Sequence, residues 1–155
     1  MPKIVLRPLA LAESDAVARL YRISYDERLP WLAGRHTPEQ DRRFFRERVF
    51  PASRIVGAYI GGALAGFSAV REDWLDQLYV LPELQSLGVG TALLSHAQAQ
   101  ADRLQLWAFQ RNTAARAFYQ RRGFRLIRET DGAESEEREP HALYLWSRST
   151  TGLSA

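Results

Sequence analysis

Cysteine is absent from this chain of 155 residues. Without thiols the protein has no disulfides, no thiolate metal site and no covalent thiol nucleophile. Long apolar stretches are missing as well, because Arg7, Pro8 and Glu13 interrupt the apolar residues at the N-terminus. We therefore predict neither a signal peptide nor a membrane span, and we expect a cytoplasmic protein without a membrane partner.

Lysine is scarce too: Lys3 is the one lysine among 21 basic residues, and the net charge is only +3. The arginines within residues 42–48 are interleaved with Glu39, Asp41 and Glu47. Nucleic-acid binding requires a clustered basic face, which this pattern does not form, so we expect no nucleic-acid partner. An RNA- or ribosome-associated protein that uses its arginines stays an alternative, which salt-dependent mixing with RNA tests.

What is present is the composition of a globular protein, 46% hydrophobic and 25% charged. The length predicts a single domain, residues 1–148, and a polar tail of small residues, 149–155, which we expect to be disordered. Apolar periodicity and turn residues predict helices at 13–28, 37–49, 88–103 and 112–122, and strands at 4–6, 55–60, 63–71, 74–80, 104–109, 124–128 and 142–146. This order predicts an α/β fold with a mixed, mostly antiparallel sheet flanked by helices on both faces.

Local signals place some boundaries within this pattern. Thr37 and Gln40 form a capping box around Pro38, which starts the second helix, and Pro51 is expected to end it. The dipeptide Gly61-Gly62 between two apolar runs predicts a β-hairpin.

A strand, a glycine-bearing loop and a helix follow one another between Asp76 and Leu94. The strand stops at Pro82, and the loop passes through Gly88 and Gly90 into the helix. The first N–H groups of a helix have no partner within it and carry partial positive charge, so this terminus is a predicted anion site. The loop ends without a lysine and has only two glycines, so it is neither a Walker A motif nor a complete dinucleotide fingerprint.

The segment 85–90, Gln-Ser-Leu-Gly-Val-Gly, resembles the acetyl-CoA pyrophosphate loop of the GNAT superfamily of N-acetyltransferases. That loop has Gln or Arg, two residues, Gly, one residue, and Gly or Ala. A second segment, Asn112-x-x-Ala115-x-x-Phe118-Tyr119 followed by Gly123-Phe124, resembles the same family's N-x-x-A-x-x-F-Y…G-F signature. The resemblance covers nearly the whole chain and implies the GNAT fold, with acetyl-CoA as cosubstrate.

The resemblance implies that one strand, the loop and the helix of the second motif hold the coenzyme. The implied binding residues are Leu78, Tyr79, Val80, Gln85, Ser86, Leu87, Gly88, Val89, Gly90, Thr91, Asn112, Ala115, Phe118 and Tyr119. Asn112 also suits a helix N-cap, and Ala115 is small enough for a ligand to come close. No metal is expected, because His36, His96 and His141 lack ligand spacing.

Tyr119 is the predicted general acid. Acyl transfer from a thioester releases a thiolate, and a tyrosine with a pKa near ~10 is still protonated at neutral pH and can donate to it. The alternative is a buried aromatic residue with a hydrogen-bonded hydroxyl. The amine must also lose a proton, and the candidate bases are Glu72, Asp73 and Asp76. We rank Asp76 first because it shares strand parity with Leu78, as Glu72 does only if the strand is regular. A bulge would remove that argument, and a solvated turn is the alternative for Glu72.

The acceptor is expected to be a primary amine of a small molecule or a peptide. The resemblance places the first helix and the following loop at the acceptor site, with Tyr25, Trp31 and His36 as candidate contacts. The acidic stretch 129–139, with Glu137 as the representative contact, either attracts a cationic amine or is simply a solvated loop. The resemblance also allows a homodimer, for which the sequence carries no signature. The remaining alternative is a catalytically silent acyl-CoA-binding sensor on the same fold.

Overall fold

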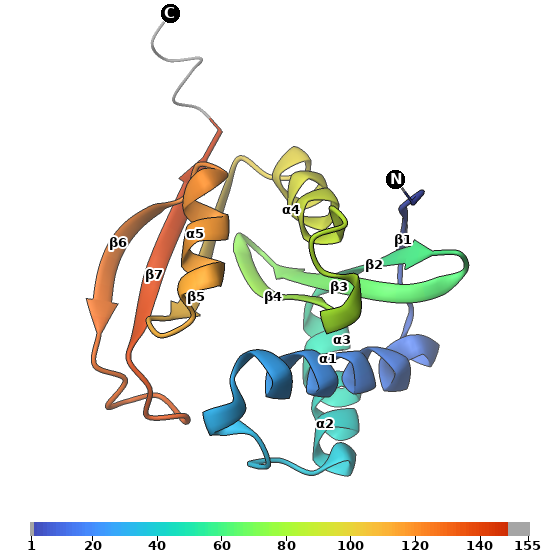
Figure 1. Ribbon diagram of the computed structural model, residues 1–155, viewed down its shortest axis with the longest axis horizontal. Coiled ribbons are helices and arrows are strands. Elements are labelled where there is room, and N and C mark those ends of the chain that lie inside the picture. The colour runs from blue at the N-terminus through green and yellow to red at the C-terminus, as the bar shows by residue number, and fades with distance from the viewer. Residues whose placement is uncertain (1, 149–155) are drawn as a thin grey trace, which may run out of the picture. The chain divides into compact units, whose positions relative to one another are not determined.

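The computed structural model describes residues 2–148 (Figure 1). The chain divides after residue 97 into two compact units. Each unit is built around its own antiparallel strands. That the two make a single domain over 1–148 stays a prediction, and the predicted tail, 149–155, lies outside the described residues.

The first unit contains four strands, β1 (Val5–Pro8), β2 (Arg54–Ile60), β3 (Ala63–Arg71) and β4 (Trp74–Val80). They pair in sequence order, and every pairing is antiparallel. The predicted hairpin is confirmed, since Ile60 pairs with Ala63 across the Gly61-Gly62 turn.

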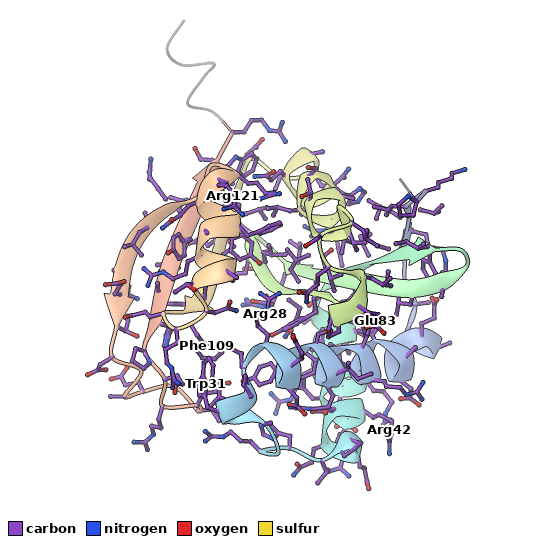
Figure 2. All side chains as sticks on the ribbon, viewed as in Figure 1. Arg28, Trp31, Arg42, Glu83, Phe109 and Arg121 are labelled. Atoms are coloured by element: carbon purple, nitrogen blue, oxygen red, sulfur yellow. The ribbon has the colours of Figure 1, made fainter. Side chains whose placement is uncertain are left out.

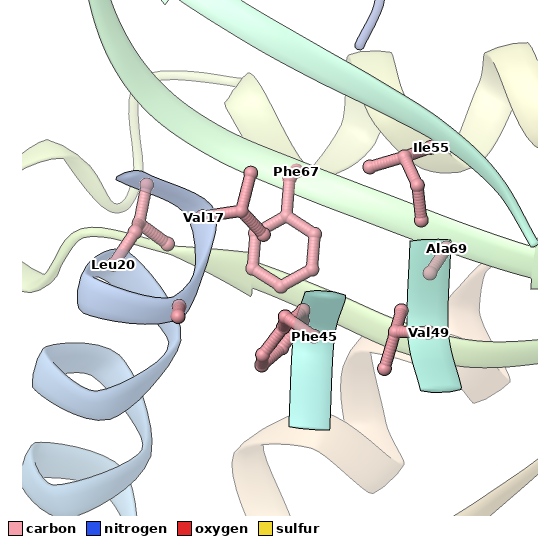
Figure 3. Close-up of a cluster of buried hydrophobic side chains, with 8 residues drawn as sticks. Val17, Leu20, Phe45, Val49, Ile55, Phe67 and Ala69 are labelled. Atoms are coloured by element: carbon pink, nitrogen blue, oxygen red, sulfur yellow. The ribbon is translucent and has the colours of Figure 1, made fainter. Parts of the chain in front are cut away.

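Helices cover both faces of this four-stranded sheet (Figure 1). On one face lie α1 (Ser14–Arg28), α2 (Pro38–Phe44) and the π-helical turn η3 (Phe45–Val49). Apolar side chains of α1 and η3 bury the sheet residues Ile55, Phe67 and Ala69 (Figure 3). Burying one large apolar side chain such as Phe67 contributes about 1.5–3 kcal/mol, so this layer accounts for much of the unit's stability.

The opposite face is covered by α4 (Val89–Ala99), whose first residues belong to this unit. Val89 and Leu93 of α4 pack against Ala58 of β2 and Ala65 of β3. With helices on both faces of a mostly antiparallel sheet, the predicted fold class is confirmed.

A buried ion pair fixes α2 against α1. The Arg22 guanidinium donates to both carboxylate oxygens of Asp41, at 2.7 and 2.8 Å, and also to Asp26. These hydrogen bonds, chiefly the one to Asp41, raise the pKa of Arg22. Removing Asp41 would leave Arg22 paired with Asp26, so the change should cost less than the about 3–5 kcal/mol typical of an unpaired buried charge.

The helix that starts at Thr37 begins as predicted but ends later. Gln40 N–H donates to Thr37 Oγ1 at 3.1 Å and Thr37 N–H donates to Gln40 Oε1 at 2.8 Å, which confirms the capping box. Pro51, expected to end the helix, instead lies inside its last turn, α3 (Phe50–Ala52). The Phe50 N–H reaches Phe45 O in a widened turn, so the helix continues over a residue that has no N–H to donate.

The second unit contains β5 (Arg103–Phe109), β6 (Arg125–Thr130) and β7 (His141–Ser147), in the order β5-β7-β6 with antiparallel pairings. Helix α5 (Thr113–Arg121) lies on this sheet, where Arg116 and Gln120 both donate to the hydroxyl of buried Tyr144.

Two predicted boundaries in this unit are wrong. The helix expected to reach Arg103 ends at Ala99, and the Arg148 side chain donates to the carbonyls of Gln98 and Ala101 on either side of that end. The acidic loop begins after Thr130, because β6 extends to that residue and includes Glu129.

Candidate functional site

The loop between β4 and α4 contains two residues with a left-handed backbone. Ser86 has a φ of +69° and Gly88 a φ of +91°. Glycine adopts this conformation readily, whereas a residue with a side chain does so at a cost of about 1–3 kcal/mol, usually where the surrounding structure imposes it. Alternation of left- and right-handed residues turns successive N–H groups toward one concave side, which is a common anion-binding arrangement.

Gln85 braces the start of this loop. Its side-chain Nε2 donates to the Val80 carbonyl at 3.1 Å, and its Oε1 accepts from Arg28 of α1 at 2.9 Å. Backbone hydrogen bonds from Leu84 N–H to Leu81 O and from Gln85 N–H to Pro82 O close the short 3₁₀ turn η4 (Pro82–Leu84) in between. These hydrogen bonds fix the backbone immediately before the strained Ser86.

Helix α4 then begins with its N-terminal N–H groups next to the loop. The first helical hydrogen bond runs from Ala92 N–H to Gly88 O at 3.0 Å, and N–H groups before it have no acceptor within the helix. The Val89 side chain is fully buried in the core, so Val89 offers a ligand only its backbone. Partial positive charge at this terminus favours an anion such as a pyrophosphate.

Gly66 of β3 lets α4 approach the sheet closely. A Cβ at Gly66 would lie 2.7 Å from Tyr79 O and 3.0 Å from Val89 Cγ1. The first distance is too short for any side chain and the second would require Val89 to shift, so Gly66 lets the first turn of α4 lie close to β3.

The backbone of β4 presents two of the three predicted residues at the edge away from β3. Leu81 N–H donates to Ala65 O, and pairing continues with Tyr79 opposite Phe67. In an antiparallel pair the hydrogen-bonding residues alternate, so the polar groups of Leu78 and Val80 face the other edge. The Tyr79 N–H is therefore directed toward β3, whereas the Leu78 N–H is directed toward the edge that a ligand would approach.

The parity argument for the base is wrong. The pairings Ala69–Gln77 and Val70–Leu75 leave Asp76 as the extra residue of a β-bulge. Glu72 lies outside β4 in the preceding turn, with a φ of +56°.

Asp76 is moreover held by an arginine of β3. Arg71 donates to its two carboxylate oxygens, at 2.9 and 3.2 Å, and this hydrogen bonding raises the pKa of Arg71. A carboxylate with both oxygens bound by a guanidinium is a weaker base candidate than a free one.

The second motif forms the start and the end of α5. The Asn112 side chain caps the helix by accepting the Ala115 N–H at 3.1 Å. Tyr119 stacks edge-on between Phe118 and Phe124, with ring centroids 5.2 and 5.5 Å away, and its side chain is half-buried. The ring is therefore fixed by its neighbours, a requirement for a group that donates a proton in one direction.

The predicted acceptor contacts lie in three different environments. Tyr25 is only 7% exposed, and its ring packs on Tyr21 at 5.3 Å, so most of it belongs to the core. Trp31 is 37% exposed in the 3₁₀ turn η2 (Pro30–Leu32), and His36 is exposed in the following loop. Glu137 is half-buried in the acidic loop of the second unit.

Sequence reasoning missed the residues that support the loop. Ser24 and Arg28 of α1 contact Val80 and Gln85, which are more than fifty positions away in the chain. Their spacing of four residues placed both on one helix face, but nothing in the sequence indicated their partners.

Within residues 2–148 no helix is long and apolar enough to cross a membrane. The same residues contain no group of three or more histidine and acidic side chains arranged to hold a metal ion.

Comparison with known proteins identifies the family. A sequence model of the acetyltransferase (GNAT) family matches residues 17–124. The chain belongs to this family. The resemblance drawn from the two motifs is thereby confirmed, and the enzyme class and cosubstrate that it implied, an acyltransferase and acetyl-CoA, are those of the family.

Among curated proteins, the peptidyl-lysine N-acetyltransferase YiaC of Escherichia coli strain K12 is 34% identical over 67 residues. The match covers 43% of this chain and 46% of that protein, less than half of its length.

Solved structures share the fold. Apo YjaB from Escherichia coli superposes with a TM-score of 0.77 at 20% identity, over 93% of this chain and 97% of that one. The PaiA N-acetyltransferase from Thermoplasma acidophilum, solved in complex with coenzyme A, gives a TM-score of 0.77 at 19% identity, over 94% of this chain and 99% of that one.

Proposed function

We propose that this protein is an N-acetyltransferase that moves the acetyl group of acetyl-CoA directly to a primary amine of a small molecule or a peptide. The observation that carries the proposal is the loop 85–90, in which a strained Ser86 and a left-handed Gly88 lead into the N-terminus of α4. This arrangement supports an anion site, and its residues have the spacing of the family's pyrophosphate loop.

Coenzyme binding would use mainly backbone groups. The N–H groups at the start of α4 and in the loop would bind the pyrophosphate. The edge of β4 would bind the amide groups of the pantetheine arm through the Leu78 backbone and the Val80 N–H, as a neighbouring strand would. Asn112, Ala115 and Phe118 are the proposed contacts from α5; the Asn112 oxygen is used by the helix cap, which leaves its NH₂ group for a ligand.

In the proposed reaction the amine nitrogen attacks the thioester carbonyl carbon. The Leu78 N–H would stabilise the negative charge that develops on the carbonyl oxygen. As the carbon–sulfur bond breaks, Tyr119 would donate its hydroxyl proton to the departing thiolate. The absence of cysteine agrees with direct transfer, because no thiol is available to form an acyl-enzyme.

The ammonium form of the acceptor must lose a proton before attack. Glu72 and Asp76 stay the proposed bases, but the bidentate contact to Arg71 weakens the case for Asp76. Glu72 lies in an exposed turn position from which a water chain can carry the proton.

A lysine side chain on a peptide is the acceptor that we favour. The partial match to a protein named as a peptidyl-lysine N-acetyltransferase supports it. The acidic residues that follow β6 also support it, since they would attract a cation. Trp31, His36 and Glu137 are the proposed contacts, with the Tyr25 hydroxyl a fourth.

The test is release of free CoA from acetyl-CoA in the presence of lysine-containing peptides, compared with polyamines and free amino acids. The chain should release CoA in proportion to peptide concentration, with the acetyl group recovered on the lysine. Tyr119→Phe should lower kcat about 10²-fold or more while the affinity for acetyl-CoA is kept, because only the proton donor is lost. A silent sensor would bind acetyl-CoA equally well in both forms and release CoA in neither.

A further inference from the structure

We propose that Ser24 and Arg28 of α1 are positioning residues for the loop 85–90, called the coenzyme loop below. They hold the end of β4 and the Gln85 side chain so that Ser86 stays in its left-handed conformation. The proposal rests on the proposed function, since it assigns these residues to acetyl-CoA binding.

The first contact fixes the end of β4. The Val80 carbonyl accepts two side-chain hydrogen bonds at 3.1 Å each, one from Ser24 Oγ and one from Gln85 Nε2. Ser24 is 3% exposed, so its hydroxyl donates inside the protein rather than to solvent. This carbonyl faces the strand edge away from β3, and it is satisfied there by side chains instead of by another strand.

The second contact fixes the loop itself. Arg28, labelled in Figure 2, follows Ser24 by four residues, a spacing that places both on one face of α1. Its guanidinium donates to Gln85 Oε1 at 2.9 Å. Gln85 thus joins α1 to β4, with one end of its amide on each. The Gln85 amide is neutral, so this contact places no negative charge against Arg28. The positive charge of Arg28 is therefore not offset by Gln85 near the predicted anion site.

The two contacts explain how an unfavourable backbone conformation is maintained. Ser86 directly follows Gln85 and is exposed, so its own side chain is not packed in a way that would hold a φ of +69°. A strained residue persists when neighbouring contacts over-determine it. Here the Gln85 side chain accepts a hydrogen bond from Arg28 and donates one to the Val80 carbonyl, so its position is fixed. The fixed Gln85 in turn holds the backbone of Ser86 in its left-handed conformation.

The experiment is calorimetric titration of the full chain with acetyl-CoA, together with steady-state kinetics and thermal unfolding. The variants are Ser24→Ala, Arg28→Ala, Gln85→Ala and the double variant Arg28→Ala/Gln85→Ala. Arg19→Ala is the matched control, because it removes an exposed arginine from the same helix. Arg28→Lys and Gln85→Glu keep the test decisive if an alanine variant fails to fold.

Arg28→Ala and Gln85→Ala should each weaken acetyl-CoA binding about tenfold, the usual effect of losing a hydrogen bond to a charged group. The double variant should lose no more affinity for acetyl-CoA than the weaker-binding single variant, because the two residues act as one unit. Gln85→Glu keeps a partner for Arg28 but cannot donate to Val80 O, so it should bind more weakly than wild type. KM for acetyl-CoA should rise while kcat is retained, and Arg28→Lys should recover part of the affinity.

Unchanged affinity in Arg28→Ala and Gln85→Ala, or losses that add in the double variant, would overturn this proposal while leaving the proposed function intact. A wild-type chain that does not bind acetyl-CoA would overturn the proposed function first, and the positioning role with it. The two failures are therefore distinguishable from the same titrations.

Discussion

Single residues of the candidate site differ in how far the sequence predicts their conformation and contacts. The glycine spacing of 88 and 90 and the capping role of Asn112 were readable because each depends on its immediate neighbours. The left-handed Ser86 was not readable, since serine has no preference for that conformation. The Arg71–Asp76 pair escaped detection as well, because the bulge that brings Asp76 to its position leaves no mark in the sequence.

Residue 86 offers a direct test of the backbone strain. Ser86→Val should lower Tm and weaken acetyl-CoA binding by about 1–2 kcal/mol, because a β-branched side chain is strongly disfavoured at positive φ. Ser86→Gly should bind at least as well as wild type, because glycine adopts the same backbone without strain. Thermal unfolding and titration of both variants measure the effect. Equal behaviour of the valine and glycine variants would mean that the conformation at this position does not matter.

At the level of helices and strands, most elements followed from apolar periodicity, whereas several boundaries did not. The capping box at Thr37 depends on residues three apart and was confirmed. The end of α4 at Ala99 was missed; the Gln98 and Ala101 carbonyls on either side of it accept hydrogen bonds from Arg148, some fifty positions later. The close contact of α4 with β3 depends on Gly66, whose neighbours Tyr79 and Val89 come from other elements.

Gly66→Ala tests whether the approach of α4 to the sheet matters for the site. The added Cβ would contact the Tyr79 carbonyl oxygen at 2.7 Å, a backbone atom that cannot rotate away. We expect a loss of about 1–3 kcal/mol in the free energy of unfolding and weaker acetyl-CoA binding, because the first turn of α4 must shift. The measurements are urea unfolding and titration with acetyl-CoA. Gly61→Ala, in the hairpin turn, is the control: it changes stability through φ alone and should leave affinity unchanged.

For the molecule as a whole, the two motifs fall in different compact units, a division that the sequence, read as a single domain, did not indicate. Family membership followed from the motifs together, since neither alone specifies an acyl-transfer protein. The acceptor could not be read in the same way. It depends on side chains such as Trp31 and Glu137, whose exposure is set by folding rather than by any local pattern.

The free energy of unfolding should decrease in acid, in part because Glu13 in the first unit loses its charge. Hydrogen bonds from the Ala10 N–H and from Arg7 lower the pKa of Glu13 below its ordinary value. A carboxylate with a lowered folded-state pKa stabilises the fold above its unfolded pKa of about 4.3, and this contribution is lost as the pH falls through the folded value. Thermal unfolding from pH 7 to pH 2 should therefore show a smaller acid loss for Glu13→Gln than for wild type. Parallel curves would show that Glu13 makes no such contribution.

The proposed function depends above all on acetyl-CoA binding through the loop 85–90. Calorimetric titration of the purified protein with acetyl-CoA, with CoA and NAD as comparison ligands, measures this directly. We predict micromolar binding of acetyl-CoA and no binding of NAD, because the loop lacks the third glycine of a dinucleotide site. Failure to bind either acetyl-CoA or CoA would contradict the account at its central point.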